Sequence, residues 1–228
     1  MAREYKKDGI RKEEILEIAQ RLFMEKGYEA TSIEAIIESA KISKGAFYYY
    51  FESKEDLVDN LINPMSDQIA GELERIVADQ NLGVFEKLRK ANEISRTIKV
   101  HNKDLLKIYM VLVNRTGNEK LRGRMVSRIH ETTLPVYQRI IEQGIAEKIF
   151  NTPSAEFAAH MVIFMAVGLY DMVWKLFVEL DDHPENAAKL DKIVDLYEDA
   201  CERLLGAPKG SLDIVKESDF HAFRKKDF

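Results

Sequence analysis

The chain has 228 residues and a formal net charge of −5, from 34 Lys and Arg against 39 Asp and Glu. That length allows one or two domains, and the acid excess argues against a generally basic nucleic-acid binder, although a local basic surface still allows groove binding. The single cysteine, Cys201, excludes a disulfide within the chain, and the charged N-terminal run MAREYKKDGIRKEE lacks a signal-peptide pattern, so a cytoplasmic protein is expected.

The first predicted element is a helix over residues 10–26. An apolar stripe at three- and four-residue steps marks its buried face, and Gly27 follows where a left-handed residue commonly ends a helix. The stripe consists of Ile15, Ile18, Ala19, Leu22 and Phe23. Before it, Arg3, Lys6 and Lys7 could reach DNA as a basic arm, although a loose, solvated terminus is the commoner outcome.

Residues 31–57 read TSIEAIIESAKISKGAFYYYFESKEDL and predict two short helices followed at once by a third. Thr31 and Glu34 have the spacing of a capping box at the start of the first helix. Ser43 is a good N-cap for the second, and Ser53 opens the third. A short helix, a brief turn and another short helix form the helix-turn-helix arrangement, whose second helix enters the DNA major groove.

The second of these helices has an unusual composition for a core element. Its first turn is small or basic, so its backbone can approach a groove wall, and the three tyrosines that follow can each donate a hydrogen bond to phosphate. Phe47 and Phe51 lie four residues apart and are expected to face inward. Because aromatic residues at helical spacing are more often core than contact residues, the pattern alone leaves DNA binding and simple packing both open.

The run ISKGAFYYYFESKEDL, preceded by TSIEAI and by a helix ending in LFMEKGY, resembles the TetR family of transcriptional regulators over residues 9–62. The resemblance implies a homodimeric DNA-binding regulator, usually a repressor, whose larger C-terminal domain binds a small molecule and controls operator affinity. It also implies a set of DNA contacts, which are Thr31, Lys44, Gly45, Ala46, Tyr48, Tyr50 and Lys54. The composition of the second helix adds Ser43 and Tyr49 to the expected DNA-contact residues.

Two positions depart from the family's pattern. Lys41 stands where the turn usually carries Gly, and a lysine can hold the left-handed conformation at a cost of about 1 kcal/mol. Ala46 stands where a hydroxyl residue is common, so an apolar contact, for example with a thymine methyl group, is expected there.

The remaining sequence reads as helices, and no stretch reads as a strand. The predicted fold is all-α, with a helix-turn-helix domain over residues 9–62, a helical ligand-binding and dimerisation domain over residues 63–206 and a tail over residues 207–228. The helix that begins at Ser53 contains Pro64, where a bend or a break is expected. The helices predicted after it cover residues 84–100, 103–115, 119–148 with a bend or split at Pro135, 153–180 and 184–205.

The helix over residues 153–180, expected to begin at a Thr152 cap and Pro153, is the most apolar of the chain. Its uncharged run, residues 161–170, is shorter than the roughly 20 residues that span a bilayer. A helix that is apolar nearly all round must be covered on most sides. The resemblance implies that a second subunit covers it, with helices 153–180 and 184–205 of both chains forming the dimer interface.

Candidate effector contacts lie in the C-terminal helices. Asp171 interrupts the apolar run, and a buried carboxylate must be paired or hydrated; it could bind a cationic ligand, although a solvated or subunit-paired acid is commoner. Methionine and aromatic side chains suit an apolar ligand, although each is more often core or interface. The candidates are Tyr109, Asn114, Met161, Phe164, Met165, Asp171 and Trp174.

No catalytic arrangement stands out, so no enzyme, cofactor or metal site is expected. The histidines are scattered, and no Gly-rich phosphate loop, G-x-S-x-G or HExxH motif occurs. Glu156 and His160 could share a metal, but ordinary polar pairing is commoner. The leading hypothesis is a regulator that binds an operator and a small molecule without a membrane; the alternatives are a helical small-molecule carrier or enzyme that lost specific DNA reading, and a helical protein–protein adaptor.

Overall fold

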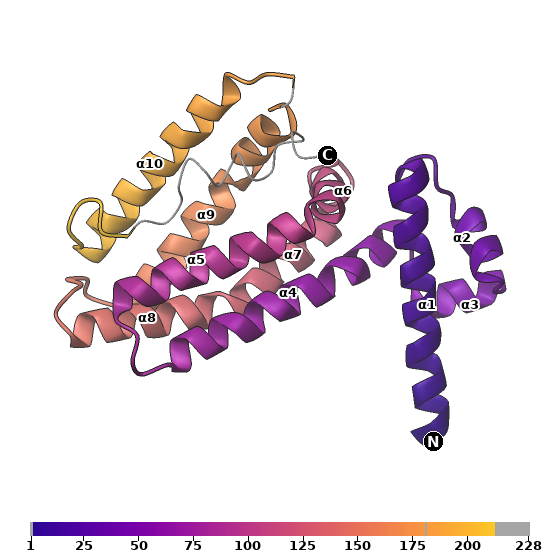
Figure 1. The fold of residues 1–228 in the computed structure, drawn as a ribbon, viewed down its shortest axis with the longest axis horizontal. Helices are drawn as coiled ribbons and strands as arrows, with labels where there is room; N and C mark the ends of the chain where they lie inside the picture. Colours follow the sequence, from indigo (N-terminus) through magenta and orange to yellow (C-terminus); the bar gives the residue numbers. More distant parts are fainter. Residues whose placement is uncertain (1, 181, 213–228) are drawn as a thin grey trace. The chain divides into compact units, whose positions relative to one another are not determined.

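The computed structural model describes residues 2–180 and 182–212, and every regular element among them is an α-helix (Figure 1). This confirms the predicted all-α class. The helices are α1 (Ala2–Lys26), α2 (Ile33–Ala40), α3 (Lys44–Tyr50), α4 (Lys54–Ala78), α5 (Val84–His101), α6 (Lys103–Val113), α7 (Glu119–Thr132), α8 (Leu134–Ala146), α9 (Ala155–Val178) and α10 (Asn186–Leu205).

The chain divides into two compact units. The head unit comprises Met1–Pro64 and Asp104–Leu121, and the body unit comprises Met65–Lys103 and Arg122–Phe228. The sequence predicts consecutive domains over residues 9–62 and 63–206. The compact units change at nearly the same point, Pro64, but they also group α6 with the head.

The core of the head unit comes from the apolar stripes of its helices. Ile15 of α1, Ile36 of α2, Phe47 of α3 and Leu57 of α4 are all 0% exposed. The rings of Phe47 and Phe51 lie 5.6 Å apart between centroids, and both are buried as the sequence predicts. Burial of these side chains provides most of the stability of such short helices, which are marginal on their own.

The starts of the short helices follow the predicted capping logic, with one shift. Ser32, not Thr31, caps α2, because its Oγ accepts the Ala35 N–H at 3.1 Å. Ser43 caps α3 in the same way, accepting the Ala46 N–H at 3.1 Å. Ser53 accepts the Asp56 N–H at 3.0 Å at the start of α4, as predicted.

Two prolines have different effects on their helices. Helix α4 runs without interruption across Pro64, so the bend or break expected there does not divide it. The predicted 119–148 helix does split, into α7 and α8, and Pro135 lies in the first turn of α8. That position suits proline because the first turn has no intrahelical acceptor for its N–H.

The start of α9 also differs from the expectation. The helix begins at Ala155, and Ser154 rather than Thr152 supplies the cap, because its Oγ accepts the Phe157 N–H at 3.3 Å.

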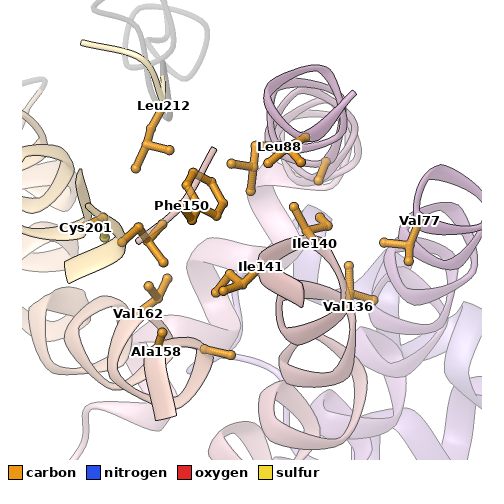
Figure 2. Close-up of a cluster of buried hydrophobic side chains, with 14 of the residues drawn as sticks. Val77, Leu88, Val136, Ile140, Ile141, Phe150, Ala158, Val162, Cys201 and Leu212 are labelled. Atoms are coloured by element: carbon orange, nitrogen blue, oxygen red, sulfur yellow. The ribbon is translucent and has the colours of Figure 1, made fainter. Parts of the chain in front are cut away.

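The body unit is built around one apolar cluster to which several helices contribute (Figure 2). Phe150, in the loop between α8 and α9, lies among side chains from α5, α8, α9 and α10. Gly144 makes room for it, because a Cβ on Gly144 would overlap the Phe150 ring. Helices α9 and α10 pack along each other within this unit (Figure 1).

One face of α9 remains apolar and exposed in the single chain. Phe157 is 71% exposed, Phe164 70%, and Met161 and Met172 nearly half. Residues Ala155–Leu176 are long and apolar enough to cross a membrane by length and composition, so the apolar segment is longer than the uncharged run over residues 161–170. One such helix among the described residues is weak evidence of a membrane span, because core helices of soluble proteins pass the same test.

Candidate nucleic-acid interface

Helix α3 separates an anchoring side from an exposed side. Phe47 is fully buried, whereas Tyr48 is 47% and Tyr49 72% exposed. Ser43, Lys44 and Gly45 at the start of the helix are also exposed. The structure therefore gathers these predicted DNA-contact residues on one surface, which we call the α3 surface and define as Ser43, Lys44, Gly45, Tyr48 and Tyr49.

The chemistry of the α3 surface suits a groove lined by phosphates. The Lys44 ammonium lies 5.9 Å from the centroid of the Tyr48 ring, which keeps the cation over the exposed aromatic face. Gly45 has open space around it, since a Cβ there would meet only Ser43 Oγ, at 3.9 Å. The backbone at Gly45 can therefore approach another surface more closely than any other residue type would allow.

Tyr50 and Ala46 are less accessible than the α3 surface. Both are half-buried. The Tyr50 ring packs edge-on against Tyr49, with centroids 4.9 Å apart. Tyr50 thus supports the exposed Tyr49 ring, and its own predicted phosphate contact remains a prediction.

The turn before α3 has an unpredicted support. Lys41 adopts the left-handed conformation with φ 50°, as expected for the position where the family carries Gly. The guanidinium Nη2 of Arg11 donates to the carbonyl oxygens of Ala40 at 3.3 Å and Lys41 at 3.4 Å. A cation at the C-terminal end of α2 is also stabilising, because that end of the helix dipole is negative. The Arg11 contact could not be found from spacing, because the bonded residues are about thirty positions apart.

Thr31 does not reach the surface at which a phosphate contact is expected. Its side chain is 0% exposed, and its hydroxyl donates to the carbonyl oxygens of Gly27 at 2.9 Å and Leu22 at 3.2 Å. The exposed hydroxyl at the N-terminus of α2 belongs to Ser32. In this structure Ser32 therefore occupies the place expected for Thr31.

Lys54 is largely committed to the head unit itself. Its Nζ donates to the carbonyl oxygens of Tyr28 and Thr31, each at 2.9 Å, and lies 3.9 Å from the centroid of the Tyr28 ring. An ammonium has three donors, so one remains for a phosphate. Lys54 is thus a positioning residue for the loop before α2 as well as a predicted DNA contact.

Acidic groups already occupy the N-terminus of α4. Asp56 accepts the Glu52 N–H at 3.0 Å, and the Glu55 carboxylate accepts the Tyr28 hydroxyl at 3.0 Å. The pKa of Glu55 is lowered: partial burial opposes the shift, but hydrogen bonds from its own backbone and from Tyr28 outweigh it. An open hollow of about 410 Å³ lies beside these groups. Its lining is Ser32, Ile33, Glu34, Tyr48, Glu52, Ser53, Lys54 and Glu55. The carboxylates that line this hollow make it unfavourable for a phosphate.

Comparisons with known proteins agree with this geometry. The family profile "Bacterial regulatory proteins, tetR family" matches residues 15–61, which hold α2, α3 and the turn between them. The HTH-type transcriptional repressor KstR2 of Mycolicibacterium smegmatis is 33% identical over 141 residues, covering 62% of this chain and 68% of that protein. The chain belongs to the TetR family.

Two further similarities show how far the likeness extends within the TetR family. The uncharacterized HTH-type transcriptional regulator YuxN of Bacillus subtilis is 50% identical over 54 residues, but these cover only 24% of this chain and 19% of that protein. A TetR/AcrR-family regulator structure from Thermobifida fusca has a TM-score of 0.55 at 24% identity, covering 82% of this chain and 96% of that one. The first likeness covers only a short stretch of the chain, and the second shows a shared fold. Both relatives are named as HTH-type transcriptional proteins, KstR2 as a repressor and YuxN as a regulator.

The effector residues predicted for this TetR-family chain are divided between the two units. Tyr109 is buried in the head unit, where its hydroxyl donates to Asp59 Oδ1 at 3.1 Å, and Asn114 is exposed in the same unit. Met161 and Phe164 lie on the exposed stripe of α9. The remaining candidates are in the body unit, where Met165 packs against the apolar cluster, Trp174 is half-buried and the side chain of Asp171 lies outside the described residues.

Glu156 and His160, which were considered as a metal-binding pair, make an ordinary contact within one helix. The Nδ1 atom of His160 lies 2.9 Å from the backbone oxygen of Glu156, not from its carboxylate. Within the part of the chain that the structure describes, no group of three or more potential ligands could hold a metal ion.

Proposed function

We propose that the chain is a ligand-responsive transcriptional regulator that binds an operator through the α3 surface and acts as a repressor released by a small molecule. The observation that carries this proposal is the α3 surface itself, in which exposed lysine, glycine and tyrosine project from a helix anchored by the buried Phe47. The name of the KstR2 relative, a transcriptional repressor, supports repression rather than activation.

An operator-binding experiment tests the proposal. Purified protein is mixed with the DNA upstream of its own gene at low salt, and specific complexes are separated from those with unrelated DNA on a native gel. Lys44→Ala should remove most of the preference for the operator, since base contacts carry sequence information, whereas Tyr50→Phe should weaken all DNA about equally if its hydroxyl contacts phosphate. Absence of any specific complex would contradict the proposal.

We propose further that two copies associate through α9 and α10. The exposed stripe of α9, together with Leu196 of α10, which is 61% exposed, supports an interface in which each copy covers the other. A symmetric pair also suits two half-sites about one duplex turn apart. Such a dimer explains the apolar run of α9 without a membrane or an unrelated protein partner.

The dimer proposal has a matched pair of variants. Phe164→Glu places a charge in the centre of the stripe and should convert the dimer to monomer in sedimentation experiments. Met24→Glu changes a side chain 44% exposed on α1 of the head and should leave the dimer intact. Monomeric wild-type protein, or recovery of the wild-type protein with lipid vesicles, would oppose the dimer.

We infer that α6 transmits the effector signal to the head. Its Tyr109 bonds to Asp59 of α4, and Arg115, just after it, pairs with Glu29 at 2.9 Å. The chain enters α6 from α5 of the body unit through Asn102. A movement of α5 on effector binding would therefore displace α6, which is hydrogen-bonded within the head unit. Tyr109→Phe should reduce the effect of the effector on operator binding more than it reduces operator binding without effector.

A further inference from the structure

Helix α5 carries two polar side chains on the flank that faces α8. Asn92 contacts Tyr137 of α8, and Lys99 follows seven residues later, two helical turns along the same side. Leu88 and Ala91 beside them are buried, whereas residues 86, 89, 93 and 97 on the opposite side are exposed. Both polar residues therefore stand on the inner part of the helix.

The Asn92 amide has a buried donor group with nothing to bind. Its Oδ1 accepts the Tyr137 hydroxyl at 3.1 Å, which fixes the orientation of the amide. Its Nδ2 is buried and has no hydrogen-bond partner among the described residues. A buried N–H group without an acceptor is costly and uncommon in folded proteins. The amide therefore points to an acceptor that the described part of the chain does not supply.

Lys99 is half-buried on the same side of the helix and carries an ammonium group. Among the described residues, no hydrogen bond or ion pair holds its ammonium group. Burial lowers the pKa of Lys99, and no carboxylate opposes that shift. Helical side chains lean toward the N-terminus of their helix, so the ammonium group leans toward Asn92.

The phenolic partner of Asn92 belongs to a group of side chains that pack against the body cluster. Tyr137, Met165 and Tyr197 are partly buried and pack against the body cluster. Tyr197 uses its hydroxyl on the Val162 carbonyl oxygen at 3.2 Å, and Tyr137 uses its hydroxyl on Asn92. Both phenols already donate within the body unit, so among the described residues discussed here the Asn92 Nδ2 and the Lys99 ammonium group remain as donors.

We propose that Lys99 and Asn92 form the polar end of the effector site and bind a carboxylate carried on an apolar molecule. The inference rests on the proposed function, which supplies the effector, and adds its chemical class. One lysine balances a single negative charge, so a carboxylate fits better than a doubly charged phosphate. The lysine would form the ion pair, the Asn92 amide would donate to the same group, and the apolar body would lie against the methionine and tyrosine side chains.

Calorimetry without DNA tests the ligand class directly. Octanoate, decanoate and dodecanoate are titrated into the full chain, with octanol, decanol and dodecanol as neutral partners of the same length. The acids should bind the wild-type protein about tenfold or more tightly than the alcohols, because a charge-assisted pair is lost in the alcohol. If no acid binds, or if acids and alcohols bind equally, the proposal is overturned.

Three variants assign the effect to the two residues. Lys99→Met and Asn92→Leu should each weaken acid binding about tenfold or more and leave alcohol binding unchanged. Lys90→Met removes a lysine from the same helix and should change neither. Equal acid affinity of Lys99→Met and wild type would contradict the assignment.

A melting experiment checks the premise separately. Removing an unpaired, half-buried charge should raise the melting temperature of Lys99→Met above that of Lys90→Met. A lower value would show that Lys99 has a structural partner and would sink the proposal. Because these measurements contain no DNA, their failure leaves operator binding standing, and failure of operator binding leaves them unaffected.

Discussion

Gly45→Ala is expected to strengthen the fold and weaken DNA binding at the same time. A Cβ at Gly45 meets nothing closer than Ser43 Oγ at 3.9 Å, so the free protein accommodates it without strain. Replacing Gly by Ala in a helix contributes up to about 1 kcal/mol, which raises the melting temperature of a chain of this length by up to about 2–4 °C. On DNA, the same methyl group would stand where the helix backbone meets the groove, and overpacking a close contact costs about 1–3 kcal/mol.

That cost corresponds to a loss of operator affinity of about 5- to 150-fold. The two measurements are a thermal melt of the free protein and a fluorescence-anisotropy titration with labelled operator. Gly123→Ala in α7, another open position of the described chain, serves as the control and should stabilise the protein without changing operator affinity. Unchanged affinity in Gly45→Ala would refute the close approach of this backbone to DNA, and a lower melting temperature would refute the reasoning about free space.

Three further variants or conditions test the packing of the two units. Lys54→Met removes two hydrogen bonds to backbone carbonyl oxygens and the contact with the Tyr28 ring. Chemical denaturation should therefore show that the free energy of unfolding falls by about 1–3 kcal/mol. An unchanged free energy of unfolding would mean that Lys54 contacts DNA but does not stabilise the head unit. Gly144→Ala forces the Phe150 ring out of its place and should lower stability by about 1–3 kcal/mol; a wild-type melting curve would contradict the packing shown in Figure 2. Burial raises the pKa of the Cys201 thiol to about 11, so iodoacetamide should label this residue at pH 8 only after unfolding. The neutral thiol's contribution to stability is complete below its ordinary pKa and is lost as the pH rises toward 11. Rapid labelling of the folded protein would refute the burial of Cys201.

Local chemistry explains why so much of the helix-turn-helix region could be predicted from the sequence. Helix periodicity assigned Phe47 and Phe51 to the core, and serine at the right spacing predicted the caps of α3 and α4. The left-handed Lys41 followed from the turn's requirement for a positive φ. Each of these depends on interactions within a few residues, and a sequence displays such neighbours directly.

The same local rules could not choose between adjacent candidates. Thr31 and Ser32 both satisfy a capping pattern, and the choice depends on carbonyl oxygens of α1 and its following loop that bind the Thr31 hydroxyl. Lys54 could equally have faced solvent, but the Tyr28 and Thr31 carbonyl oxygens draw it inward. These partners are brought near by folding, so spacing along the chain carries no record of them.

The sequence by itself determined the helical class, the family and the anchored side of α3, because periodicity, caps and turn residues are local properties. Only the tertiary structure decided that Tyr109 is buried in the head while Met161 is exposed on α9, and that the Asn92 Nδ2 and the Lys99 ammonium group have no partners among the described residues of the body. The reason is physical: whether a polar group is satisfied depends on atoms supplied by distant segments, and those atoms become neighbours only when the chain has folded.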